Sequence, residues 1–304
     1  MATRLAVIVP CHDDGVLVAE AVHSVREEEP LEVVVVDDAS SDEETQETLE
    51  RVEHEGVSVL RLEENCGVGN ARMTGLAVTS APFVFPLDAD DQALPGVMAC
   101  MADALEAHPE AAACVGDVVE FGEHDLTRLV PARLDPYRVA YTNEYPITAL
   151  FRRSALVVAR AWERHWVRQG YEDWNLWMSF AERGEQIVHL GGPVYRRRLH
   201  GRRLNQKTRE AHREHYEAMR RLHPDLFKRL PQYRRESDLP LLRRVLYPLL
   251  FGARAEVPFE RTLKPWFDRL GIWTRTAPRS GGGRRKRRRG QEFSNGPLSA
   301  TRPR

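Results

Sequence analysis

The chain has 304 residues, of which 42% are hydrophobic and 29% are charged, and its formal net charge is −1. This composition is typical of a folded globular protein and excludes a fibrous or wholly disordered chain. The charge is unevenly spread, because ten Arg or Lys side chains and a single acid, Glu292, lie from Arg275 onward. The four cysteines show neither metal-ligand spacing nor a regular disulfide pattern, which favours a reducing cytoplasm.

The first 120 residues alternate short apolar runs with amphipathic segments. The β-branched runs 4–9 and 31–36 are typical of buried parallel strands. Apolar residues at helical spacing separate them, namely Val18, Ala21, Val22 and Val25. Ser41 followed by Glu44 is a capping-box signature for a second helix, which we expect to end near Gly56.

The same alternation continues to about residue 120. We expect a strand at 57–62, a helix from about 67 to 80, a strand at 83–87, a helix after Pro95 and an apolar strand at 111–119. This order predicts a doubly wound α/β sheet, in which ligands bind beyond the carboxyl ends of the strands.

The second half is less regular. Residues 144–156 predict a strand or buried turn that leads into a helix, and 171–184 predict a helix that ends at Gly184. Residues 186–201 suggest a strand, a turn and a second strand, and 206–235 suggest charged helices. The longest apolar stretch, "LPLLRRVLYPLLFG", is interrupted by Arg and Pro and is shorter than the roughly 18 apolar residues of a spanning helix, although it could lie on a membrane surface.

Polar sequences follow the first four predicted strands at the point where each strand ends. These sequences are "PCHDD", "DDASSD", "EENCGVGNAR" and "DADD". Because the carboxyl ends of parallel strands meet at one edge of a sheet, we expect the acidic groups to gather there.

Asp88, Asp90 and Asp91 place three like charges close together after the fourth strand. In an extended segment, residues two apart project to the same side, so Asp88 and Asp90 could converge on one ion. Hard oxygen ligands favour Mg²⁺ or Mn²⁺, and a phosphate-bearing substrate would complete the coordination shell. The alternative is an ordinary turn rich in Asp before the next helix.

Five motifs in chain order resemble the family-2 glycosyltransferases of GT-A fold. They are "VIVPCHDD" (7–14), "VDDASSD" (36–42), "NCGVGNAR" (65–72), "DADDQALP" (88–95) and "EDWNLW" (172–177). Together they are far more specific than any one alone, and the resemblance covers roughly residues 4–205. It implies an inverting transfer of a sugar from a nucleoside-diphosphate sugar to an acceptor hydroxyl.

The resemblance also implies roles for donor-site residues. Asp38 would bind the nucleotide base, with Pro10 and His12 lining the base pocket and Arg72 lying near the base or ribose. Asp88 would contact the ribose. His12 stands where the family usually has a tyrosine, which leaves the nucleotide preference open; UDP is the first expectation, ahead of GDP or dTDP.

Metal and acceptor residues follow from the same resemblance. Asp90 would bind the Mn²⁺ or Mg²⁺ that bridges the diphosphate, with Asp91 and His200 as further candidate ligands. Asp173 would be the general base and Glu172 would hold the acceptor or orient Asp173. A carboxylate at a helix N-terminus should have a lowered pKa, which would make Asp173 a weaker base.

Other segments have two interpretations. Arg196–Arg198 could bind phosphate or an acidic acceptor, or form a solvated strand edge. Trp174 could stack on an acceptor sugar or belong to the core. We expect Trp177 to be a core residue. The "GVGNAR" segment resembles a dinucleotide fingerprint but follows the third strand and lacks the last glycine.

Three competing functions are considered. A haloacid-dehalogenase-type phosphatase needs its D-x-D after the first strand, and a sugar-nucleotide pyrophosphorylase needs a glycine-rich basic loop there; neither is present. A degenerate GT-A protein could instead act as a membrane or nucleic-acid adaptor through its basic tail.

We expect an α/β GT-A domain over 1–235, divided into a nucleotide-sugar half (1–120) and an acceptor half (121–235). A helical extension (236–275) and a disordered basic tail (276–304) would follow it. The acceptor is expected to be a glycan, a lipid-linked or a small molecule. We expect a cytoplasmic protein with no specific nucleic-acid partner, whose 284–289 run could attract it to the anionic inner face of the membrane.

Overall fold

The computed structural model describes residues 3–123, 125–162, 170–199, 211–254 and 276–277. The predictions for His200, for the basic run 284–289 and for a disordered tail lie outside these residues. Within them, no helix is long and apolar enough to cross a membrane.

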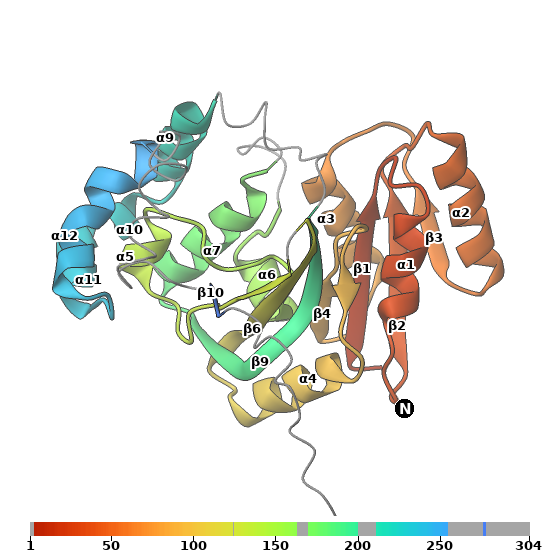
Figure 1. The fold of residues 1–304 in the computed structure, drawn as a ribbon, viewed down its shortest axis with the longest axis horizontal. Helices are drawn as coiled ribbons and strands as arrows, with labels where there is room; N and C mark the ends of the chain where they lie inside the picture. The colour runs from red at the N-terminus through yellow and green to blue at the C-terminus, as the bar shows by residue number, and fades with distance from the viewer. Residues whose placement is uncertain (1–2, 124, 163–169, 200–210, 255–275, 278–304) are drawn as a thin grey trace, which may run out of the picture.

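A single mixed sheet runs through the described part of the molecule (Figure 1). Its parallel portion has the order β4-β1-β2-β3, formed by β1 (Leu5–Cys11), β2 (Leu31–Asp37), β3 (Ser58–Arg61) and β4 (Phe83–Pro86). Every residue of β1 is buried, as its continuous apolar sequence predicts for a strand covered on both faces.

Three helices connect these strands: α1 (Leu17–Ser24), α2 (Glu43–His54) and α3 (Val68–Val78). The α1 helix buries Val18, Ala21 and Val22, as their spacing predicts. The predicted cap of α2 is wrong by one residue, because Asp42, not Ser41, accepts a hydrogen bond from the Thr45 amide. An Asp is as good an N-cap as a Ser, so the sequence pattern fitted both registers.

Strand order reverses at β1, which has β2 on one side and β4 on the other. With right-handed crossovers, α1 and α2 cover one face of the sheet and α3 covers the other. The crevice at this reversal lies outside the carboxyl ends of β1 and β4, where residues 12–14 and 88–91 follow. The topology thus brings two of the acidic segments together.

The rest of the sheet contains β5 (Gln92–Ala93), β6 (Ala111–Gly122), β7 (Leu126–Arg128), β8 (Leu150–Arg152), β9 (Gln186–Leu199) and β10 (Thr276–Ala277). In this part of the sheet the long β6–β9 pair is parallel and the other, shorter pairs are antiparallel. The predicted strand–turn–strand at 186–201 is wrong, because β9 is one long strand. Gly191, at φ +88°, lies in an irregularity of the β6–β9 register, so "GGP" forms a bulge instead of a reversal.

Helices surround this half of the sheet (Figure 1). They are α4 (Val97–Ala107), α5 (Pro136–Val139), α6 (Arg153–Val158), α7 (Glu172–Arg183), α9 (His212–Leu222), α10 (Pro224–Lys228), α11 (Leu230–Glu236) and α12 (Leu241–Leu250), followed by a 3-10 turn at Gly252–Arg254. The α7 helix ends at Gly184 in the left-handed conformation, as predicted.

Both tryptophans of α7 belong to the core. Trp177 is fully buried and donates to the Pro146 carbonyl, whereas Trp174 is 5% exposed and donates to the Val139 carbonyl at 2.7 Å. Trp174 therefore has no free face with which to stack on an acceptor sugar, and only the core interpretation stands.

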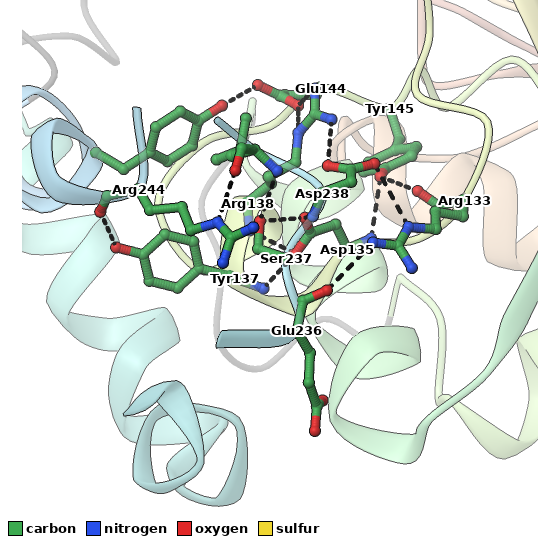
Figure 2. A network of polar contacts seen from close by, with 12 residues as sticks. Arg133, Asp135, Tyr137, Arg138, Glu144, Tyr145, Glu236, Ser237, Asp238 and Arg244 are labelled. Carbon is green, nitrogen blue, oxygen red and sulfur yellow. Dashed lines mark hydrogen bonds and ion pairs between the residues drawn. The ribbon is translucent and has the colours of Figure 1, made fainter. Parts of the chain in front are cut away.

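A polar network attaches the C-terminal helices to α5 (Figure 2). Asp135 caps α5 by accepting from the Tyr137 amide at 2.9 Å, and its second oxygen accepts from the Ser237 hydroxyl at 2.6 Å. Arg138 forms ion pairs with Glu144 at 2.6 Å and Asp238 at 3.1 Å. Residues 135–144 are therefore held by contacts within the segment and by contacts with Ser237 and Asp238.

Close packing of α3 on β1 gives a test of the fold. A Cβ added to Gly75 would lie 2.4 Å from the Ile8 Cγ2 atom, inside a fully buried core. We expect Gly75→Ala to lower the free energy of unfolding by about 1–3 kcal/mol, despite the better helix propensity of Ala. Urea titration measures this change, and Gly192→Ala, with no atom within 4 Å of the added Cβ, is the neutral control. Equal midpoints for both variants would contradict the packing.

Candidate functional site

Hydrogen bonds between loops fix the edge of the sheet where the first three strands end. The Asp38 amide donates to the Cys11 carbonyl, and the Leu62 amide donates to the Asp37 carbonyl, both at 2.8 Å. The Asp13 carboxylate accepts from the amides of Ser41 and Asp42, at 2.7 and 3.0 Å. The loops that carry the first motifs are thus a connected, ordered rim.

Asp38 is 3% exposed and holds the start of α3. Its two oxygens accept from the Cys66 and Gly67 amides at 2.8 and 2.7 Å. Each carboxylate oxygen keeps a further lone pair, so this structural role leaves room for a contact with a ligand. The neighbouring Pro10 is buried in β1, whereas the His12 imidazole is 42% exposed and lies 2.8 Å from the Asn65 amide nitrogen.

The acidic segment after β4 is a turn, and the extended geometry expected for it is wrong. The Asp91 amide donates to the Asp88 carbonyl at 3.0 Å, which closes a turn over 88–91. Alternation of side chains therefore does not apply, and Asp88 and Asp91 bind different partners. Asp88 binds Arg72, while Asp91 accepts from the Arg198 amide of β9 at 2.9 Å.

Arg72 joins the two halves of the site. This arginine of α3 is 3% exposed, and its guanidinium lies 2.6 Å from Asp88 and 3.3 Å from Glu172 at the start of α7. A buried cation needs acidic partners, since an unpaired charge in the interior is strongly destabilising. The ion pairs bring the aspartate-rich turn and the "EDW" helix start to the same place.

Asp173 lies beside this ion-paired cluster. Its two oxygens accept from the Trp174 amide at 2.9 Å and from the Asn143 side-chain amide at 3.0 Å. Burial, and then the neighbouring Glu172 carboxylate, raise the pKa of Asp173 to about 6. The lowered pKa expected from the helix dipole is therefore wrong, because desolvation outweighs the dipole.

Asp14 lies in the first motif, but the sequence analysis gave it no role. Its carboxylate accepts from the His12 amide at 2.9 Å, and burial together with the charges of Asp90 and Asp88 raises its pKa to about 6. Burial and the same two charges raise the pKa of Asp91 well above its usual range. The signal in the sequence was the second acid of "HDDG", which follows the strand at the reversal point of the sheet.

The arginines of β9 have mixed roles. The Arg196 and Arg198 guanidiniums lie over the Phe121 ring, 4.2 and 4.7 Å from its centroid. Arg198 also pairs with Glu20 and donates to the Asp90 carbonyl at 3.1 Å. These contacts exclude the simple solvated edge and attach β9 to the aspartate-rich turn.

Within the ranges that the structure describes, no three His, Cys, Asp or Glu side chains form a group that could hold a metal ion. Asp88 is paired with Arg72 and Asp91 with β9, and His200 lies outside the described residues. A metal at this rim would therefore need oxygen ligands from the substrate or water in addition to those of the chain.

Comparison with known proteins agrees with the motifs. The model of the family described as glycosyl transferase family 2 matches residues 6–160. Among curated proteins, the amylovoran biosynthesis glycosyltransferase AmsE of Erwinia amylovora is 29% identical over 137 residues, or 43% of this chain and 50% of AmsE. The succinoglycan biosynthesis protein ExoU of Rhizobium meliloti is 36% identical over 98 residues, or 31% of this chain and 28% of ExoU. The chain thus spans at most half of these relatives.

Solved structures share the fold. S. aureus TarS 1–349 in complex with UDP-GlcNAc has a TM-score of 0.59 at 19% identity, over 88% of this chain and 78% of TarS. The mannosyltransferase PcManGT from Pyrobaculum calidifontis, in complex with GDP-Man and Mn²⁺, has a TM-score of 0.54 at 18% identity, over 90% of this chain and 84% of PcManGT. The architecture is that of the GT-A glycosyltransferases, and because the family match extends over more than half of the 304 residues, the chain belongs to glycosyl transferase family 2.

Proposed function

We propose that the protein is an inverting, metal-dependent glycosyltransferase that moves a sugar from a nucleoside-diphosphate sugar to an acceptor hydroxyl. The observation that carries this proposal is the pair of contacts made by Arg72, with Asp88 at 2.6 Å and Glu172 at 3.3 Å. They put the acids proposed for the donor and the acids proposed for the acceptor within one cluster.

The donor side would use the rim of the parallel strands. Asp38 is the proposed contact of the nucleotide base, Pro10 and His12 the lining of its pocket, and Asp88 the contact of the ribose. Arg72 would lie near the base or ribose. The ordered hydrogen bonds between these loops support the proposal, because a site that is already rigid loses little conformational entropy on binding.

The charges at the rim fit a divalent cation. Asp14, Asp88, Asp90 and Asp91 are close enough that the charges of Asp88 and Asp90 raise the pKa of both other acids. Carboxylate oxygens suit Mg²⁺ or Mn²⁺, and Asp90 is the proposed ligand. Asp91 is the weaker candidate, since it already binds β9. A bound cation would offset the negative charge of the departing diphosphate.

Asp173 is the proposed general base. A sugar hydroxyl is a poor nucleophile until its proton is removed during attack, and a carboxylate with a pKa of about 6 is largely ionised at neutral pH yet more basic than an exposed aspartate. Attack from the side opposite to the leaving diphosphate would invert the anomeric carbon. Glu172 would orient Asp173 or hold the acceptor.

The donor and acceptor are proposed by class. UDP is the first choice of nucleotide, supported by the TarS complex with UDP-GlcNAc, with GDP supported by the PcManGT complex. The names of AmsE and ExoU refer to polysaccharide biosynthesis, which supports a glycan or lipid-linked acceptor. A cytoplasmic enzyme at the inner face of the membrane would be consistent with such an acceptor.

Donor binding should require the metal. We expect UDP- or GDP-sugars to raise the melting temperature only when Mn²⁺ or Mg²⁺ is present. Without the metal, the carboxylates of Asp14, Asp88, Asp90 and Asp91 would repel the diphosphate. Thermal-shift measurements with Asp90→Asn should show no such increase. Asp103→Asn, which removes an exposed acid elsewhere, is the matched control. A full shift without metal would contradict metal dependence.

Removal of one rim charge should stabilise the protein without ligand. Asp14→Asn retains an oxygen for the His12 amide and removes a charge that the fold disfavours. Because the folded pKa of Asp14 is raised to about 6, its ionisation costs stability as pH rises from about 4 to 6. At pH 7.5 we expect a gain of about 1–3 kcal/mol, from chemical unfolding curves, which shrinks toward pH 4. A gain independent of pH would rule out this electrostatic origin.

Loss of the base should separate turnover from donor binding. We expect Asp173→Asn to lower kcat by about 10²–10⁴-fold and to leave the metal-dependent thermal shift intact. In the unaltered enzyme, kcat should fall about tenfold per pH unit below about pH 6, as Asp173 becomes protonated. Initial rates over pH 5–8 test this, and an unchanged kcat in the variant would remove Asp173 from the mechanism.

A further inference from the structure

Within the described residues, Asn143 is the only side chain that donates a hydrogen bond to the Asp173 carboxylate. Its Nδ2 donates to Asp173 Oδ2 at 3.0 Å, while its Oδ1 is shielded from solvent and has no hydrogen-bond partner within the described part of the chain. A buried oxygen without a partner is destabilising, so hydrogen bonding of Oδ1 does not explain the orientation of the Asn143 amide. Rotating it by 180° would press oxygen against carboxylate oxygen, and the orientation is therefore set by Asp173.

The position of Asn143 is fixed through its neighbour. Glu144 is 5% exposed; its Oε2 accepts from Arg138 of α5 at 2.6 Å, and its Oε1 accepts from the Tyr247 hydroxyl of α12 at 2.6 Å. Figure 2 shows Glu144 and Arg138 pointing toward one another within the polar network. The C-terminal helices thereby hold the segment that carries Asn143.

Several charged groups act on Asp173 from the elements around it. Glu172 on its own helix and Asp88 in the turn after β4 oppose its ionisation, as burial does, whereas Arg72 on α3 favours it. A hydrogen-bond donor to a carboxylate also favours the ionised form. Asn143 is thus a neutral group that acts in the same direction as Arg72.

We propose that Asn143 is a positioning residue that holds Asp173 ionised and in one rotamer for proton abstraction from the acceptor. This inference rests on the proposed function. The Trp174 amide fixes Oδ1 and Asn143 fixes Oδ2, so the carboxylate plane cannot turn, while each oxygen keeps a lone pair for the incoming hydroxyl. A base held in this way meets the geometric requirement of general-base catalysis.

Two substitutions test the proposal. Asn143→Leu keeps the size of the side chain and removes the donor, and Asn143→Asp places a second carboxylate against Asp173. We expect the acidic limb of the kcat–pH profile to move upward by about one pH unit in the first and further in the second. The activity of Asn143→Asp should therefore recover toward pH 8.5. Donor binding, measured by the metal-dependent thermal shift, should be unchanged.

Asn175→Ala is the matched control. Asn175 lies on the same helix as Asp173, and its Oδ1 lies 3.0 Å from the His223 Nε2 atom, whose ring also contacts Glu182. Its loss should lower the melting temperature and leave the pH limb in place. If the limb stays near pH 6 in both Asn143 variants, the inference is overturned. If instead Asp173→Asn retains normal turnover, the proposed function itself fails, so the two failures are distinguishable.

Discussion

The buried guanidinium of Arg72 is the interaction on which the site depends. Its partners, Asp88 and Glu172, are separated by more than eighty residues in sequence and come from opposite halves of the molecule. A cation this deeply buried is stable only while both acids are near it. The α3 helix, the turn after β4 and the start of α7 are therefore coupled electrostatically by the chain's own charges. The closeness of the groups proposed for the donor and for the acceptor follows from this coupling.

Much of the fold could be predicted from local sequence patterns. The apolar runs at 4–9 and 31–36 predicted the parallel strands β1 and β2, and Gly184 predicted the end of α7. These features could be predicted because each is determined by residues that are neighbours in the sequence. The errors arose where two local patterns were equally good. Ser41 and Asp42 are both good caps, and "GGP" is as compatible with a bulge as with a turn.

The site was harder to predict, because its properties depend on packing between distant segments. The motifs named the acids proposed for the site, but they could not show that Asp88 pairs with Arg72 or that Asp91 accepts from the Arg198 amide of β9. Nor could they show that burial raises the pKa of Asp173, since the helix N-terminus argues locally for the reverse. Asp14 was missed although it ends the first motif, because the sequence does not show that it is buried beside Asp88 and Asp90. Asn143 was missed because it lies in no motif.

The attachment of the last helices to α5 limits how the chain can be shortened. Asp135 and Arg138 are almost completely buried, and each depends on the Ser237–Asp238 segment for a partner. A fragment that stopped after α11 would remove the Ser237 hydroxyl from Asp135 and the Asp238 carboxylate from Arg138, and the loss of a partner from a buried polar group is destabilising. Because the Tyr247 hydroxyl donates to the buried Glu144 carboxylate, a shortened chain that keeps this packing would also have to include Tyr247, although that residue lies well beyond the last recognisable motif.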